Sequence, residues 1–186
     1  MAGEMRPRFR EDKAIAAAAE LIMLSEGQCD KYWLNKIMYY IERISLVDSG
    51  QPVFFDTLFS VKFGPIVSAI NDGIDASAYP YDSPWSKYFH LSGNSVSLKE
   101  SPDTSILSPY EEELISAAFE KFKGQNFSQL RNYFHKLPEF QNTETREEIH
   151  YRDIFSTEGL SEHEIQETVN EISYLASIEK IGMSSH

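Results

Sequence analysis

The sequence predicts a mainly α-helical protein, a compact helical domain with one small β-hairpin from about Lys87 to Lys99. Apolar side chains recur every three or four positions through several long segments, which is the period of an amphipathic helix. One shorter segment alternates with a period of two about Gly93-Asn94, which is typical of a hairpin. The 186 residues are 41% hydrophobic and 25% charged, so the chain can form one domain with a full core.

The N-terminal part predicts an arm and two helices. Residues 1–10 contain three arginines and are expected to form a mobile arm. Residues 11–25 are apolar around most of the helical circumference, which predicts a central helix that ends at Gly27. Asp30 can cap a second helix, at about residues 30–47, by accepting hydrogen bonds from the free N–H groups of its first turn.

The segment Val61-Lys62-Phe63-Gly64-Pro65-Ile66-Val67 predicts a sharp turn followed by a helix. Gly64 can adopt backbone angles that other residues avoid, and Pro65 fits the first turn of a helix because it has no N–H to donate. We therefore expect the next helix to begin at Pro65.

Residues 79–85 are expected to form a loop, because they contain two prolines. The loop also carries Tyr79, Tyr81 and Trp85. Their rings could fold back over the core, or they could form an exposed contact surface, since Tyr and Trp dominate interface hot spots. We keep both interpretations, and these three residues are the candidate partner-binding residues.

The hairpin has a register that agrees with its pattern. With Gly93-Asn94 at the turn, Leu91 lies opposite Val96 and Phe89 lies opposite Leu98, all on one face. A two-stranded hairpin is marginal alone, so we expect this face to lie on the helices.

The C-terminal half predicts further helices from their capping residues. Ser108-Pro109-Tyr110-Glu111 has a capping-box pattern and begins one of them, and Asn126 caps a shorter one. Residues 149–155 are expected to dock on the core, and Ser161 caps a final helix with a strongly acidic outer face. Residues 11–180 would then form a single helical domain, followed by a tail at residues 181–186.

Two segments, Leu34-Asn35-Lys36-Ile37-Met38-Tyr39 and the one from Val61 to Val67, carry recognisable motifs. They resemble the Panacea domain, also called the SocA-like antitoxin family, which has Leu-x-Lys-Leu-x-Tyr at the first position and a Gly-Pro-Val-Val element at the second. A later family element, Leu-x-x-x-Thr-His…Pro-Trp, is similar to Leu130…His135…Pro138-Glu139-Phe140, with Phe134 for the Thr and Phe140 for the Trp. The resemblance covers roughly residues 9 to 180. The family-motif residues that we assign a structural role are Leu34, Lys36, Tyr39, Lys62, Phe63, Gly64, Pro65 and His135.

The turn motif and the helix motif are expected to pack together. The helix register places Lys36 and Tyr39 near the turn that contains Phe63, Gly64 and Pro65, and motifs of one family usually share a packing arrangement. We therefore predict that these five residues form one cluster.

The resemblance implies an antitoxin that neutralises a cognate toxin by direct binding. A SocA-type member delivers its toxin to a Clp-type protease, so the resemblance also allows a proteolytic adaptor. A third hypothesis comes from the residues alone, an uncharacterised enzyme in which Cys29 pairs with His135 or His150. The identity of the toxin and the oligomeric state are not written in the sequence.

The charge and the residue types exclude several classes of site. The net charge is −12, from 29 acidic and 17 basic residues, and most of the excess lies after residue 138. Such a balance repels phosphate backbones and would steer a basic toxin, so we expect a protein partner and no nucleic acid.

The five histidines fall in no ligand spacing, so we expect no metal, no cofactor and no catalytic residue. No apolar run could span a bilayer, and the single cysteine suits a reducing cytoplasm.

Overall fold

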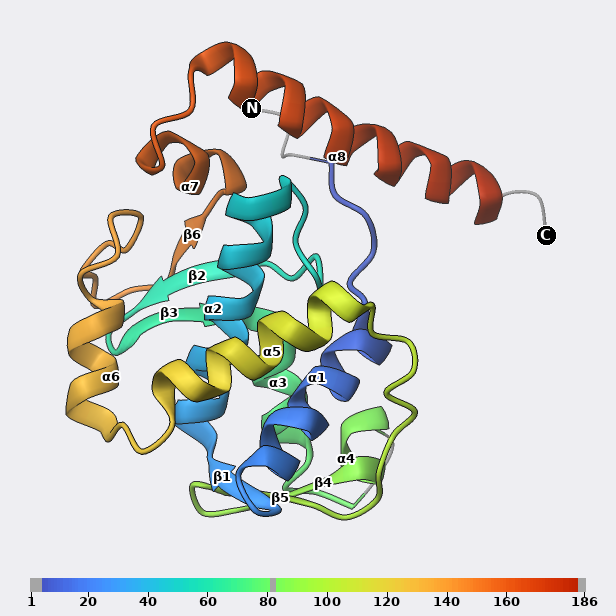
Figure 1. The fold of residues 1–186 in the computed structure, drawn as a ribbon, viewed down its shortest axis with the longest axis vertical. Helices are drawn as coiled ribbons and strands as arrows, with labels where there is room; N and C mark the ends of the chain where they lie inside the picture. Colours follow the sequence, from blue (N-terminus) through green and yellow to red (C-terminus); the bar gives the residue numbers. More distant parts are fainter. Residues whose placement is uncertain (1–4, 81–82, 184–186) are drawn as a thin grey trace.

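A computed structural model describes residues 5–80 and 83–183, and within these ranges the chain forms eight helices and two three-stranded sheets (Figure 1). The mainly helical class is confirmed. The prediction of a single hairpin underestimates the β-structure, because six strands are present in this part of the chain. The elements in order are α1 (Glu11–Leu24), β1 (Gln28–Asp30), α2 (Lys31–Ser49), β2 (Leu58–Val61), β3 (Gly64–Val67), α3 (Ser68–Ala76), α4 (Pro84–Tyr88), β4 (Phe89–Ser92), β5 (Ser95–Leu98), α5 (Pro109–Phe122), α6 (Phe127–Phe134), β6 (Glu147–Ile149), α7 (Tyr151–Thr157) and α8 (Glu162–Met183).

Helix α2 is the centre of the fold. It contacts α1, α3, α5, α6 and α7 as well as strand β3. Its start is fixed as predicted, because the Asp30 carboxylate accepts the Trp33 N–H at 3.0 Å, and it ends at Gly50 with a positive φ of 73°. Helix α1 packs closely beside it, since its buried face consists largely of alanines that leave little space between the backbones. The buried side chains form one hydrophobic cluster from α1 to α8.

The predicted hairpin is β4 and β5. Phe89 pairs with Leu98 and Leu91 pairs with Val96, as the sequence predicts. A third strand, β1, adds to the hairpin through Cys29 opposite Val96, giving the order β1-β5-β4. The three residues of β1 lie between two helices and are too few to establish a period of two, so only the pairing defines them as a strand.

The second sheet corrects the helix that was predicted to begin at Pro65. Its strand order is β3-β2-β6, and Pro65 lies within the edge strand β3, opposite Ser60. An edge strand has one side without ladder partners, so proline is tolerated there although it has no N–H. The helix begins three residues later, at Ser68, where the Asp56 carboxylate accepts the N–H groups of Ala69 (2.9 Å) and Ile70 (3.0 Å).

Helix α8 lies across one end of the molecule, beside α7 and the N-terminal segment (Figure 1). The part of the expected mobile arm that the structure describes contacts the body of the domain. Arg6 pairs with Glu148 at 2.8 Å, Arg10 pairs with Glu179 of α8, and the Arg10 N–H donates to the Phe54 carbonyl at 2.8 Å. Helix α8 also continues to Met183, into the expected tail. No helix within residues 5–80 and 83–183 is long and apolar enough to cross a membrane.

Candidate functional site

The ammonium of Lys36 is buried beside the turn motif. The side chain is 1% exposed, and its Nζ donates to the Pro65 carbonyl at 2.5 Å and lies 4.9 Å from the centre of the Tyr32 ring. Burial disfavours the charged form and lowers the pKa of Lys36 to about 7. Lys36 therefore joins the middle of α2 to strand β3.

Two side chains of α2 cover the free edge of β3. Lys36 occupies the Pro65 carbonyl, and the Asn35 amide Nδ2 donates to the Val67 carbonyl at 3.4 Å. In an antiparallel strand alternate residues bond to the neighbouring strand, so these two carbonyls face away from β2. An uncovered edge would be open to pairing with another chain. The contact therefore links the lysine of the helix motif to the edge strand that contains Pro65.

Gly64 is required by the same contact. Its φ is +103°, and a Cβ at this position would lie 3.3 Å from both Cε and Nζ of Lys36 and 3.5 Å from Cδ2 of His135. The structure thus brings Lys36, Gly64, Pro65 and His135 together. The ring of His135 rests on Phe140 with centroids 4.5 Å apart. Burial, followed by the charges of Arg131 and Lys36, lowers the pKa of His135 and favours a neutral ring.

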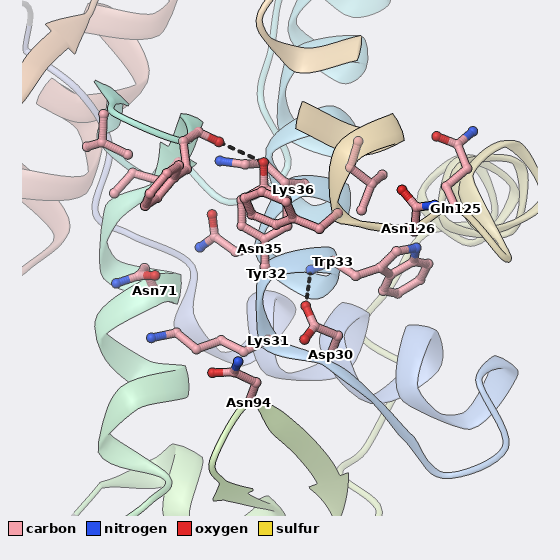
Figure 2. Close-up of a pocket in the computed structure, with 15 residues that line it drawn as sticks. Asp30, Lys31, Tyr32, Trp33, Asn35, Lys36, Asn71, Asn94, Gln125 and Asn126 are labelled. Atoms are coloured by element: carbon pink, nitrogen blue, oxygen red, sulfur yellow. Dashed lines mark hydrogen bonds between the residues drawn. The ribbon is translucent and has the colours of Figure 1, made fainter. Parts of the chain in front are cut away.

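A groove of about 590 Å³ opens next to Lys36 (Figure 2). It lies between α2, the turn before β3, α3 and the start of α6. Amide side chains are frequent among the residues that line it, together with aromatic and aliphatic ones. The lining residues are Asp30, Lys31, Tyr32, Trp33, Asn35, Lys36, Val61, Phe63, Ile66, Asn71, Asn94, Gln125, Asn126, Phe127 and Leu130.

Three aromatic rings, Tyr32, Phe63 and Phe127, form what we call the aromatic rim of this groove. The ring centres of Tyr32 and Phe127 are 4.5 Å apart, and those of Phe63 and Phe127 are 5.9 Å apart. Phe63 and Phe127 are 46% and 47% exposed. The Tyr32 hydroxyl donates to the Phe63 carbonyl at 2.7 Å, which fixes the turn against α2. The rim is therefore a preformed apolar surface in contact with solvent.

Asn35 carries a buried acceptor without a partner. The residue is 3% exposed, and its Oδ1 has no hydrogen-bond partner within the part of the chain that the structure describes. Turning the amide over would remove the bond from Nδ2 to the Val67 carbonyl, so neither orientation satisfies both atoms with groups of the protein.

Behind the groove, α2 is tied to the C-terminal half by a buried ion pair that sequence reasoning missed. Glu139 accepts from the Arg43 Nε at 2.6 Å, from the Arg43 Nη2 at 3.2 Å and from the Tyr39 hydroxyl at 3.0 Å. Arg43 also donates to Glu158 at 2.6 Å. Of the five residues expected to form one cluster, Lys36, Gly64 and Pro65 are joined by the contacts above and Phe63 lines the groove with Lys36. The Tyr39 hydroxyl is bonded to Glu139 instead.

A second buried carboxylate on α2 organises the segment before β2. Glu42 is fully buried and accepts the N–H groups of Phe54 (2.8 Å) and Asp56 (3.0 Å). Burial raises the pKa of Glu42 to about 8, against the lowering effect of these N–H donors. The sequence held a signal for it, since Glu42 lies at helical spacing from Met38 and Tyr39 on the apolar face of α2.

The remaining motif residues have ordinary surroundings. Leu34 is fully buried in the core, and Lys62 forms an exposed pair with Glu144 at 3.0 Å. Neither takes part in the groove, because neither belongs to its lining.

The candidate contact loop at residues 79–85 needs a correction. Tyr79 is 70% exposed, and Tyr81 lies outside the described residues. Trp85 is 1% exposed, with its indole N–H donating to Glu11 at 3.1 Å and its ring in contact with Phe89. Trp85 belongs to the core, because the short helix α4 turns it inward, and it cannot serve as an exposed contact.

The environment of Cys29 does not favour nucleophilic chemistry. Burial, with a smaller effect from Asp30, raises the pKa of Cys29 to about 12, so the thiol stays protonated near neutral pH. Within residues 5–80 and 83–183, no group of three or more His, Cys, Asp or Glu side chains is arranged to hold a metal ion.

The family model for the antitoxin SocA-like, Panacea domain matches residues 34–141, which is more than half of the chain. The chain therefore belongs to the SocA-like Panacea family. The matched region contains Lys36, the turn at Gly64 and Glu139. No curated protein and no solved structure matches the chain.

Proposed function

We propose that this protein is an antitoxin that neutralises a cognate toxin protein by binding it directly. The observation that carries the proposal is the family match over residues 34–141, which contains the cluster at Lys36 and the part of the groove lining from Asn35 onward. The exposed aromatic rim supplies the kind of surface that dominates protein interfaces. The net charge of −12 suits a basic partner and disfavours nucleic acid.

We further propose that the protein acts in the cytoplasm and by binding alone, with no chemical step. The protonated Cys29 thiol supports the lack of a nucleophilic step at this residue. Delivery of the toxin to a Clp-type protease remains the alternative mechanism, and the level of the toxin in the cell distinguishes it from blocking.

The experiment is co-expression with the product of the adjacent gene. That product should arrest growth when it is induced alone, and this protein should restore growth and co-purify with it. A chain that ends at Trp33, and so lacks the matched region, should do neither. Blocking predicts that the toxin level stays constant on an immunoblot while growth recovers. Delivery predicts that the toxin disappears and that inactivating the protease restores it. A toxic product that this protein neither binds nor neutralises would contradict the proposal.

A further inference from the structure

The groove beside Lys36 offers a hydrogen-bond acceptor that the protein itself leaves unused. Asn35 Oδ1 is buried and unpartnered within the described residues, while its Nδ2 is held by Val67. A buried polar atom without a hydrogen bond is unfavourable, and a bound molecule that donates to it removes this cost. The acceptor belongs to a side chain that lines the groove, so the donor would come from an occupant of the groove.

The aromatic rim offers apolar contact area at low entropic cost. Phe63 and Phe127 are each nearly half exposed, yet their rings touch, and the Tyr32 hydroxyl anchors the backbone at Phe63. Rings that are already ordered lose little freedom when a partner covers them. An apolar side chain placed on this rim would bury surface on both molecules.

The charges of the groove argue against an anionic ligand. Its two lysines are engaged, since Lys31 pairs with Asp75 and Lys36 donates to the Pro65 carbonyl. Asp30 accepts the Trp33 N–H. The other polar side chains are mostly amides, as Figure 2 shows, and an amide can both donate to and accept from a peptide main chain.

The occupant cannot extend the sheet as an added strand. The two carbonyls on the free edge of β3 are occupied by Lys36 and Asn35, and Pro65 has no N–H to offer. A partner chain is therefore restricted to the groove itself, where side-chain amides rather than a strand edge would hold its backbone.

On the basis of the proposed function, we infer that the groove receives a loop or terminal segment of the toxin. This segment places an apolar side chain on the aromatic rim and donates an N–H to Asn35 Oδ1. Uncharged contacts of this segment, with the amide side chains and the aromatic rim of the groove, determine the position of the toxin. The acidic charge elsewhere on the protein assists association.

The test is the affinity for the purified product of the adjacent gene, measured by calorimetric titration. Phe63→Ala and Phe127→Ala should each raise Kd by about 30-fold or more, as expected for interface hot spots. Asn35→Ala should raise Kd by about tenfold through the lost acceptor. Tyr79→Ala and Tyr174→Ala remove aromatic rings elsewhere that are even more exposed, and they should change Kd by less than about twofold.

The outcomes separate the inference from the proposed function. Failure of the unmodified protein to bind contradicts the proposed function itself. Normal binding by Phe63→Ala and Phe127→Ala refutes the groove and leaves direct binding standing. A loss confined to Tyr174→Ala also refutes the groove, because it places the contact on α8. Unchanged melting temperatures of the two rim variants ensure that a loss of affinity is not a loss of folding.

Discussion

Breaking the buried ion pair between Arg43 and Glu139 should destabilise the domain strongly, because it leaves a buried charge poorly compensated, and Glu139→Gln tests this. The Glu139 side chain is 0% exposed and that of Arg43 is 8% exposed. Gln keeps the shape, but it has only one acceptor oxygen for donors that approach both carboxylate oxygens. Removing one partner of a buried pair costs about 3–5 kcal/mol. Arg43 keeps Glu158 as a partner, so we expect about 3 kcal/mol.

The assay is urea unfolding followed by tryptophan fluorescence. Trp33 and Trp85 are both buried and report on the core. The matched control is Glu144→Gln, which removes the carboxylate of an exposed pair with Lys62 and should cost less than about 1 kcal/mol. A cost of less than about 1 kcal/mol for Glu139→Gln would refute the reasoning, because the pair would then behave like a surface pair.

Three further predictions concern the buried residues of the motif and the loop. The pKa of Lys36 is lowered to about 7 from an ordinary value of 10.5, so between these pH values the folded chain binds fewer protons than the unfolded chain. Lys36 therefore makes the free energy of unfolding rise with pH, by at most about 1.4 kcal/mol per pH unit. Urea titrations from pH 7 to 9 should show that Lys36→Met lacks this rise. Equal slopes would contradict the burial of the ammonium. Gly64→Ala should destabilise by about 1–3 kcal/mol in the same assay, since φ is positive and the new Cβ crowds Lys36, and an unchanged midpoint would exclude this strain. Trp85→Ala should cost about 3–5 kcal/mol whereas Tyr79→Ala should stay within about 0.5 kcal/mol, and similar values for the two would restore the contact-loop interpretation.

Several helix starts and the hairpin could be predicted because their signals are local, whereas the start predicted at Pro65 was wrong because pairing with β2 makes that segment a strand. Asp30, Ser108 and Asn126 each cap the helix that follows them, as expected from residues only a few positions apart. The turn at Gly93 sets the register of β4 and β5 in the same way. The four other strands have three or four residues each and are defined by their pairing partners, so their sequences carried no period to detect.

The site could be predicted only in part, for a related reason. Family resemblance pointed to Lys36 and Gly64, but not to the physical link between them, which is the carbonyl of Pro65. Glu139 lies 96 positions from Arg43, and no local pattern marks such a pair. Phe127 looked like an ordinary first residue of a helix, and only the fold places its ring beside Phe63.

The most direct test of the groove as the partner-binding site is hydrogen–deuterium exchange of the protein alone and in complex with its toxin. Binding should slow exchange in residues 63–67 and 125–130, which contain Phe63 and Phe127 of the aromatic rim, while α8 exchanges at the same rate in both states. Protection confined to α8, with the amides around Phe63 and Phe127 unchanged, would contradict the account.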